Sequence, residues 1–449
     1  MGEILTGQRH FINTAFLAVP LLLVFLYWYT GIAALYFAGA ALLVIIFLSK
    51  SDIIAFCMLF ALLPLENMLR MEGAPFSIVS VVIVLLFLKL FIQRKFKLDL
   101  VMFMMIVFMV FFLGLHTLVY SRLFDLDNLR FFVNIVYISS LFLVYKRTLT
   151  LKALIITKYF IFGTALLLLF SLIYTIFTLQ IDLLASRLYG LREDPNYIAV
   201  MFSIATGLCL INLHQKRMNP ILCNILMLFF MAGVLLTQSR GGLLAFTPNF
   251  FCYAYLMLKV DKRQVVVSAV VTLFLVYVTN QNRVFVDSVF ENLTGRIDNA
   301  DSDGGSGRLD IWMAYLHLYS QDIGQLLLGP HENVYPKQGS GVIVAHNLVL
   351  GAIAQSGGIN LIFIGIAFVN LAKIIKDVSG VYGIYMIGLL PIVIMGAGYF
   401  FLDAVFINVF IYAFVLSLMI IYLRPELQMK RDSREEVLRF DKSTLIGEQ

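Results

Sequence analysis

The sequence predicts an all-α polytopic membrane protein with about fourteen transmembrane helices. Apolar residues make up 61% of the chain and charged residues only 13%, and the mean hydropathy is +0.91. Long apolar runs follow one another along the chain, and most charges fall in the short gaps between them, in a regular alternation. No soluble core needs this much apolar surface, so the composition excludes a soluble multi-domain protein.

The apolar runs define the predicted spans, because each is long enough to cross a bilayer when tilt is allowed for. The first run is too long for a signal peptide and lacks a cleavage site of small residues, so it is read as a span. The whole chain, 1–449, is expected to form a single membrane domain. The predicted limits are 11–30, 31–49, 52–66, 76–93, 99–120, 129–145, 152–179, 196–213, 219–238, 240–258, 264–280, 342–375 with a break, 380–400 and 402–423.

Basic residues orient these runs, because cytoplasmic loops are enriched in Lys and Arg. The even-numbered gaps hold clusters such as Arg94–Lys97 and Lys146–Lys152, and the C-terminal tail at 424–449 is also basic. We therefore expect this side to be cytoplasmic, with both termini inside. The net charge of +6 does not indicate nucleic-acid binding, because the enrichment of Lys and Arg on the cytoplasmic side explains the excess of positive charge.

The opposite, outer side uses a different cation. Nine of its ten basic residues are arginine, whereas lysine predominates on the cytoplasmic side. Chance and a general tolerance of arginine are one explanation of this ratio. A planar guanidinium also grips an oxyanion with two hydrogen bonds, so the ratio favours an outer face that handles phosphate.

Two outer loops are substantial, 181–195 and 281–341. In the longer one, Arg283–Ile297 has apolar residues at helical spacing, which predicts an amphipathic helix on the membrane surface. A glycine-rich break follows, and a second helix is expected from GRLDIW onward, capped by Ser306. The polar stretch Asp301–Ile359 is too long for a simple connector between apolar runs, so it predicts a functional site.

Three outer residues have unusual positions. Arg240, in TQSRGG, opens the tenth run; it either snorkels at a helix end or binds an anion, and the two glycines allow a close backbone approach. Arg308, in the first turn of its expected helix, opposes the macrodipole; it is either a solvated loop residue or part of an anion site. His346, before Asn347 in an apolar run that Gly357-Gly358 interrupts, is either a packing residue or a base for a hydroxyl.

A second polar cluster precedes the eighth run and contains Arg187, Arg192, Asp194 and Asn196, which either bind substrate or cap that helix. No motif with metal-ligand spacing is present, and the four cysteines lie inside apolar runs, so we expect neither a metal nor another cofactor. The centres of the runs are almost free of ionisable groups. Their absence argues against an ion-coupled transporter, which needs carboxylates at mid-membrane.

Four motifs together resemble the O-antigen ligase and O-antigen polymerase superfamily of bacterial envelope glycosyltransferases. They are DPN at Asp194–Asn196, SRGG at Ser239–Gly242, GRLDIW at Gly307–Trp312, and HNxxL at His346–Leu350 followed by Gly357-Gly358. Each motif alone is weak, but their order and their shared outer location make the set fairly specific. The resemblance covers roughly 185–375, which is therefore the expected catalytic core.

The resemblance implies a metal-independent glycosyltransferase of the C-type fold class, in the bacterial inner membrane, with a periplasmic active site and a long periplasmic helical loop. Its donor is a glycan on undecaprenyl diphosphate. Arg240 and Arg308 match the arginines that hold the diphosphate, and His346 matches the histidine that activates the acceptor hydroxyl. The expected substrate-binding residues are Arg187, Arg192, Asn196, Asn347 and Ser239.

The predicted function is a polymerase that joins lipid-linked O-antigen repeat units. The alternative within the family is the ligase that transfers glycan to lipid A-core; the sequence has more predicted spans than such ligases, which slightly favours the polymerase. A lipid-linked oligosaccharide flippase or other transporter suits the span count but not the bare span centres. The expected partners are the lipid-linked oligosaccharide, membrane lipids, a chain-length regulator and a flippase.

Overall fold

The computed structural model describes the longer segments 2–72, 77–93, 157–178, 195–214, 218–239 and 308–328. It also describes short pieces at 118, 188, 242–243, 246–247, 249, 337–338, 341–342, 350, 353 and 358. These residues are almost entirely helical, as predicted. The predicted spans at 99–120, 129–145, 264–280, 380–400 and 402–423, apart from the helical Leu118, lie outside the described residues, as do the surface helix at 283–297 and the tail at 424–449.

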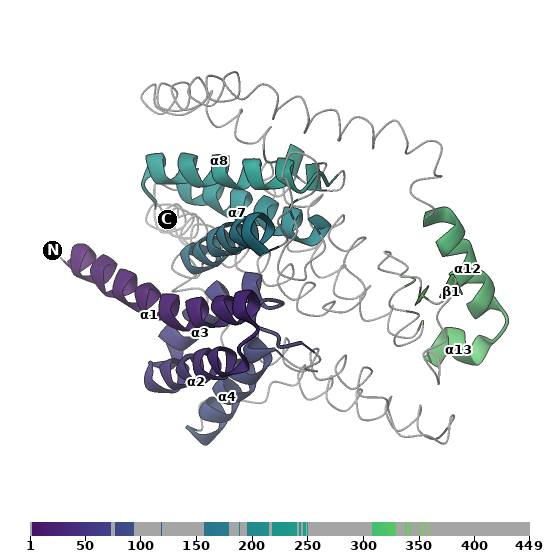
Figure 1. Cartoon of the computed structure of the whole chain (residues 1–449), viewed down its shortest axis with the longest axis horizontal. Helices are drawn as coiled ribbons and strands as arrows, with labels where there is room; N and C mark the ends of the chain where they lie inside the picture. Colours follow the sequence, from purple (N-terminus) through teal and green to yellow (C-terminus); the bar gives the residue numbers. More distant parts are fainter. Residues whose placement is uncertain are drawn as a thin grey trace, which may run out of the picture.

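The first helices form a group at the N-terminal end of the chain (Figure 1). Apolar sequence and the near absence of helix breakers account for their lengths, and their limits lie close to those of the first four predicted spans. Only α1 departs clearly, because it begins well before residue 11 and includes the polar residues that precede the apolar run. The elements are α1 (Gly2–Thr30), α2 (Ala33–Ser49), α3 (Asp52–Leu62), the short 3-10 helix η1 (Leu63–Leu65) and α4 (Ile78–Ile92).

Local signals set the turns between these helices. Gly31 joins α1 to α2 with a φ of +73°, a left-handed conformation that glycine adopts without steric cost. Ser77 caps α4, because its side-chain oxygen accepts a hydrogen bond from the backbone N–H of Ser80 at 3.3 Å. Gly31 thus sets the turn between α1 and α2, and Ser77 sets the start of α4.

One end of this group is held together by aromatic side chains. Trp28, near the end of α1, donates its indole N–H to the carbonyl oxygen of Met68 at 2.7 Å. Tyr36, near the start of α2, donates its hydroxyl to the carbonyl oxygen of Leu69 at 3.0 Å. The N–H of Ile78, where α4 starts, donates to the same carbonyl at 2.9 Å. The end of α1 and the starts of α2 and α4 thus meet at one end.

The opposite end of the group is held by lysine. Lys89, in the last turn of α4, donates its ammonium to the carbonyl oxygens of Leu48 at 3.2 Å and of Lys50 at 2.7 Å. A cation at these carbonyls is favourable because it complements the C-terminal end of the α2 dipole. Lys50 itself lies over the ring of Phe16, 4.8 Å from its centroid. Consecutive helices therefore run in opposite directions, as successive membrane crossings require.

A second group of helices packs against the first. It contains the helix Thr157–Phe177, which closes in the π-helical turn η2 (Tyr174–Thr178), together with α7 (Pro195–His214) and α8 (Pro220–Leu236). Prolines occupy the first positions of α7 and α8, where the missing N–H has no helical partner. Asn219 caps α8 by accepting a hydrogen bond from the N–H of Ile221 at 2.9 Å.

Among the described residues, one helix is long and apolar enough by itself to cross a membrane. This helix, Thr157–Phe177, has 21 residues and a mean hydropathy of 2.3, and half of its apolar window is buried inside the protein. Five further apolar helices are shorter, at 10–17 residues. Length and composition alone do not separate such helices from the core helices of soluble proteins.

The two groups share a continuous hydrophobic core, and their contacts fix the direction of the second group. The rings of Phe25 in α1 and Phe170 stack at 4.7 Å with an interplanar angle of 17°. Asn212, near the end of α7, donates its side-chain amide to the hydroxyl of Thr157 at 3.2 Å. Because α7 ends beside Thr157, α8 begins at that same end and finishes at the end where Trp28 and Tyr36 lie. We call this end the α8 end.

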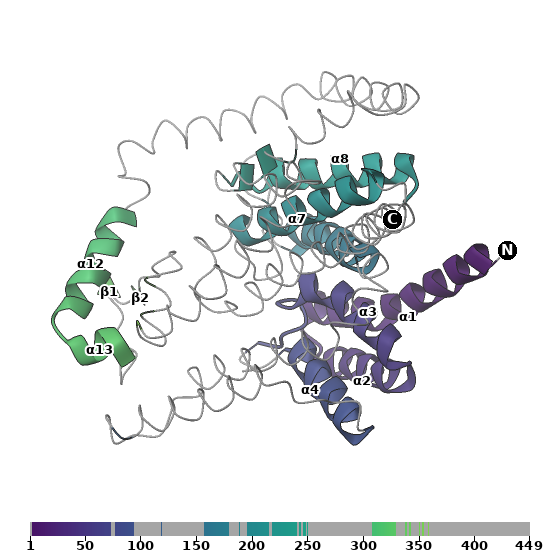
Figure 2. The same ribbon diagram turned by 180° about the vertical axis from the view of Figure 1, so that it is seen from behind.

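The remaining elements come from the long loop and the region after it. They are α12 (Arg308–Ser320), α13 (Ile323–Leu328) and two antiparallel strands, β1 (Lys337–Gln338) and β2 (Gly341–Val342), in which Lys337 pairs with Val342. Both views place α12 and α13 apart from the helix bundle, on the side where α1 and α8 end (Figures 1 and 2).

The second loop helix, expected over GRLDIWMAYLHLYSQ, is confirmed by α12, which ends at Ser320. A separate short helix follows after Asp322, whose carboxylate accepts from the N–H of Gly324 at 2.8 Å. One prediction in this region is wrong. The apolar run expected to be helical from 342 starts instead with a strand residue, Val342, which pairs with Lys337 in an antiparallel ladder, because β-branched valine favours extended backbone. Ser306, the predicted cap, lies outside the described residues.

Candidate active site

The structure describes three of the predicted site residues. Ser239 is described in full, while Asn196 and Arg308 are placed as residues of α7 and α12 without their side chains. Arg187, Arg192, Arg240, His346 and Asn347 lie outside the described residues. Their neighbours in the sequence are described, and these neighbours show which segments meet.

A buried polar turn ends α8. Thr237 donates its N–H to the carbonyl oxygen of Gly233 at 3.1 Å, and Gln238 donates to that of Leu235 at 3.0 Å. Gln238 has a φ of +48°, a left-handed conformation that costs a residue with a side chain about 1–2 kcal/mol. Thr237, Gln238 and Ser239 are all buried. Strained backbone of this kind gathers at functional sites, so the turn is the first element of the candidate site.

Ser239 starts the next helical turn. Its hydroxyl oxygen accepts a hydrogen bond from the N–H of Gly242, and its carbonyl oxygen accepts one from the N–H of Leu243, both at 2.9 Å. These are the bonds of an N-cap residue. The described role of the Ser239 side chain is therefore capping, and the residue directly after the cap in the sequence is Arg240.

Gly242 allows α7 to approach this turn closely. A Cβ atom at Gly242 would clash with the Cβ of Ala199 on α7. The glycine motif was predicted to let another helix approach the backbone, and at Gly242 this is confirmed. Ala199 lies one turn after Asn196 in α7, so SRGG packs against the first turns of the helix that carries Asn196. Asn249 adds a buried bond between the same segments, donating its side-chain amide to the carbonyl oxygen of Ser203 at 2.7 Å.

Leu188, in the loop at 181–195 that was predicted to be outer, reaches the same place. Leu188 is fully buried, and its N–H donates a hydrogen bond to the carbonyl oxygen of Leu236, the last residue of α8, at 2.8 Å. Arg187 immediately precedes Leu188 in the sequence, and Arg192 follows four residues later. The segments that carry these arginines and Arg240 therefore meet at the α8 end. We call the place where Leu188, the turn after α8 and the first turns of α7 meet the α7–α8 junction.

A second unit forms around α12. Tyr315 and Tyr319, the largest fully buried side chains of this helix, pack against Leu350 and Ile353. The N–H of Gly358 donates to the carbonyl oxygen of Leu326 in α13 at 2.7 Å. We call this assembly the α12 unit.

The α12 unit joins the two halves of the predicted polar stretch. Arg308 is the first residue of α12, as predicted, and His346 precedes the packed Leu350 by four residues in the sequence. The helix that carries the arginine and the segment that follows the histidine are thus packed on one another. Residues from both ends of the polar stretch at 301–359 therefore pack together in the α12 unit.

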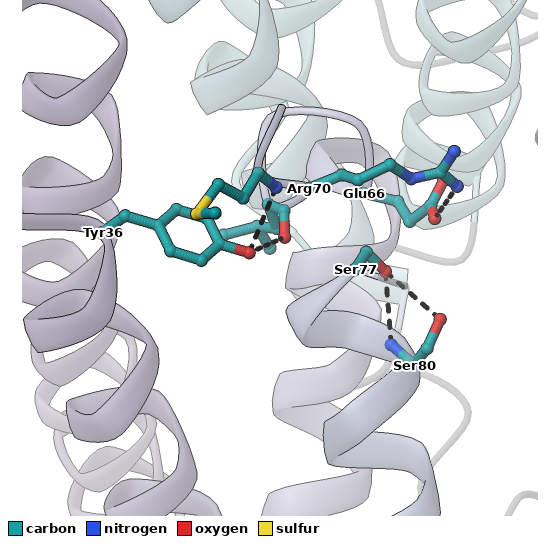
Figure 3. A network of polar contacts seen from close by, with 7 residues as sticks. Tyr36, Glu66, Arg70, Ser77 and Ser80 are labelled. Atoms are coloured by element: carbon teal, nitrogen blue, oxygen red, sulfur yellow. Dashed lines mark hydrogen bonds and ion pairs between the residues drawn. The ribbon is translucent and has the colours of Figure 1, made fainter. Parts of the chain in front are cut away.

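Sequence reasoning overlooked one polar cluster. Glu66, directly after η1, is fully buried, and its Oε1 accepts a hydrogen bond from Nη2 of Arg70 at 2.9 Å (Figure 3). Arg70 was noted only as one of the outer cations, and Glu66 was not singled out. The signal was present, because an acidic residue four positions before an arginine is a recognised pairing.

The described residues include no group of three or more His, Cys, Asp or Glu side chains that could hold a metal ion. The three described cysteines, Cys57, Cys209 and Cys223, are buried, which fits the packing role predicted from their place in apolar runs.

A comparison with protein families finds a match to the O-antigen ligase family at residues 225–365. No curated protein and no solved structure matches the chain. The matched range includes most of α8, the buried turn, SRGG, α12, α13 and the segment that packs on them. Members of this family are membrane glycosyltransferases of polysaccharide biosynthesis, acting as ligases or polymerases. Residues 225–365 of this chain are therefore a domain of the O-antigen ligase/polymerase family.

Proposed function

We propose that the protein is a polymerase that joins lipid-linked polysaccharide repeat units at the periplasmic face of the bacterial inner membrane. It transfers a glycan from undecaprenyl diphosphate to a hydroxyl of an acceptor sugar. The observation that carries the proposal is the α7–α8 junction, where the hydrogen bond from Leu188 to Leu236 joins two arginine-bearing segments, one of them in the family domain.

The two arginines assigned to the diphosphate have related positions. Arg308 is the first residue of α12, and Arg240 directly follows Ser239, the N-cap of the next helical turn. Backbone N–H groups at a helix start favour an anion, and a guanidinium adds a charged, bidentate donor. Two such positions in one family domain support a site for the two phosphates of a diphosphate.

The chemistry follows from these assignments. The acceptor hydroxyl attacks the anomeric carbon of the donor sugar, and its proton passes to His346. A new glycosidic bond forms while the bond from the anomeric carbon to the diphosphate oxygen breaks. Undecaprenyl diphosphate leaves with the bonding electrons, and Arg240 and Arg308 stabilise the negative charge that develops on it. No metal ion takes part in this proposal, since the arginines supply the positive charge.

The α12 unit supports the pairing of Arg308 with His346. Tyr315 and Tyr319 pack α12 against Leu350, which follows His346 by four residues in the sequence. A base and a charge-stabilising group must be held in fixed relation for proton transfer and departure of the leaving group to be coupled. Asn347, Asn196, Arg187 and Arg192 are proposed to contact the substrate around this centre.

The proposal includes the predicted organisation of the chain. It has about fourteen spans in a single membrane domain, both termini in the cytoplasm, and a catalytic core at 185–375 with a periplasmic loop at 281–341. The proposed partners besides the lipid-linked donor are membrane lipids, a chain-length regulator and a flippase.

Deletion of the gene tests the proposal against the ligase alternative. Loss of a polymerase leaves surface lipopolysaccharide capped by a single repeat unit, which electrophoresis resolves as one discrete band. Loss of a ligase leaves lipid A-core without any O-antigen, with polymer retained on undecaprenyl diphosphate. Translocation of lipid-linked repeats by the purified protein, without any chain extension, would instead identify a flippase.

A further inference from the structure

The buried ion pair of Glu66 and Arg70 has unused hydrogen-bonding capacity. Only Glu66 Oε1 and Arg70 Nη2 are joined, at 2.9 Å. Glu66 Oε2 and Arg70 Nε are both buried and have no hydrogen-bond partner in the part of the chain that the structure describes. The pair thus has one unsatisfied acceptor, Glu66 Oε2, and one unsatisfied donor, Arg70 Nε. Buried polar groups in proteins almost always have a hydrogen-bond partner.

Loose packing does not explain these unsatisfied atoms. The loop that carries the pair is fixed by Trp28, which donates to the carbonyl oxygen of Met68. Tyr36 fixes it a second time, since its hydroxyl donates to the carbonyl oxygen of Leu69 and accepts from the N–H of Met71 at 3.2 Å (Figure 3). A loop held by two aromatic side chains keeps the ion pair in one place.

The two atoms define the chemistry of a ligand. A group that satisfies both must accept a hydrogen bond from Arg70 Nε and donate one to Glu66 Oε2. A hydroxyl does both at once. A phosphate or carboxylate does not, because it has no proton for Oε2 and is repelled by the carboxylate that already neutralises the arginine. The pair therefore differs from the anion sites proposed at Arg240 and Arg308.

We propose that Glu66 and Arg70 form a second recognition site, which takes a neutral sugar hydroxyl of the glycan. The choice of a glycan rests on the proposed function, and the choice of a hydroxyl rests on the ion pair. Trp28 and Tyr36 place this pair at the α8 end, where the α7–α8 junction also lies. The Arg70 side chain is 26% exposed whereas the Glu66 side chain is fully buried, so a ligand reaches the pair from the side of Arg70.

Trp28 provides a direct test, because its indole is bonded to the same loop and the chain has only one other tryptophan, Trp312. The full-length Trp312→Phe protein is titrated with the oligosaccharide that mild acid releases from the lipid-linked donor. We expect a saturable change in Trp28 fluorescence. In this background, Glu66→Gln loses the charged acceptor and Arg70→Lys loses the Nε donor, and each should weaken binding by about tenfold or more.

Glu72→Gln is the matched control, since Glu72 is exposed and only two residues beyond Arg70, and it should bind the oligosaccharide like the parent protein. Arg70→Lys keeps the positive charge beside Glu66, so it remains informative if thermal unfolding shows that Glu66→Gln is unstable. Inorganic pyrophosphate should leave Trp28 fluorescence unchanged; a response that requires Glu66 would make this an anion site and overturn the inference.

The absence of any saturable response to the oligosaccharide would mean that the pair binds an ordered water only, which also overturns the inference. The titration requires no turnover. If the oligosaccharide binds through Glu66 and no transfer reaction is found, the proposed function fails while the recognition site stands. If transfer is found and all variants bind alike, the site fails and the function stands.

Discussion

Leu188 donates its backbone N–H to the carbonyl oxygen of Leu236, at 2.8 Å. This single bond joins Leu188 to the last residue of α8, 48 positions later in the sequence. A helix leaves its last carbonyl groups without partners inside the helix, and the loop satisfies one of them. The loop that carries Arg187 and Arg192 is consequently tied to the turn that leads into Arg240.

Leu188→Pro should therefore reduce donor binding, because proline lacks the N–H that makes this bond. On the proposed function, KM for the lipid-linked donor rises several-fold while the bundle still folds. Leu188→Met keeps the N–H and an apolar side chain of similar size, so it is the control. Initial rates with purified protein and lipid-linked donor measure the difference, and equal KM values for both variants would contradict the role given to this bond.

Ser239→Ala should weaken the start of the helical turn that follows it. The variant loses the bond that the hydroxyl oxygen accepts from the N–H of Gly242, and loss of such a cap costs about 1 kcal/mol. Ser239→Thr keeps a hydroxyl and should restore most of the loss. Thermal unfolding in detergent measures stability, and a transfer assay reports on Arg240. If Ser239→Thr were as damaged as Ser239→Ala, a role other than capping would be indicated.

Gly242→Ala should destabilise the packing between SRGG and α7, since its Cβ meets that of Ala199. Overpacking of this kind costs about 1–3 kcal/mol. The compensating variant is Gly242→Ala combined with Ala199→Gly, which removes the clashing atom from the other side. We expect the double variant to regain most of the thermal stability that the single one loses. Independent, additive losses would show that the two positions do not touch.

Arg240→Ala and His346→Ala test the chemistry itself. Removing a donor to the leaving group lowers the transfer rate by about 10²–10³-fold. Removing a general base lowers it by about 10²–10⁴-fold. Both variants should insert and accumulate like the parent protein, which immunoblotting of membranes checks. Full-length polymer in cells that carry either variant would refute the assignment.

The sequence predicted the helices well because apolar runs and helix limits depend on local pattern. Most described helices begin and end within a few residues of the predicted limits. It also predicted a helix with Arg308 in its first turn, because a glycine-rich stretch of sequence precedes a regular helical pattern. The strand at Val342 was missed, because an apolar run of β-branched residues does not separate strand from helix.

Contacts between distant segments could not be predicted in the same way. The sequence around Leu188 has no feature that indicates Leu236 as its partner. The spacing of Glu66 and Arg70 indicates their pairing, but not that Glu66 is fully buried. The Leu188 contact and the burial of Glu66 depend on how helices pack, a non-local property that no alternation or spacing encodes. The function of Ser239 as an N-cap was predictable, since a serine before a new apolar run is a common helix start.

Leu350→Ala tests whether the α12 unit positions the site. Leu350 packs against the buried Tyr315 and Tyr319, and truncating a buried leucine costs about 2–5 kcal/mol. This substitution weakens the packing between α12 and the segment after His346. We therefore expect the rate of transfer to fall by more than tenfold, whereas the thermal unfolding of the helix bundle should change little.

Met313→Ala is the matched control for this experiment, because Met313 lies on the same helix with 64% of its surface exposed and makes no part of the buried cluster. It should transfer glycan at nearly the parent rate. Conservative replacement by Leu350→Met keeps the apolar volume and should restore activity. If Leu350→Ala and Met313→Ala behaved alike, α12 would not hold Arg308 in a fixed relation to His346, and the two residues would need another common support.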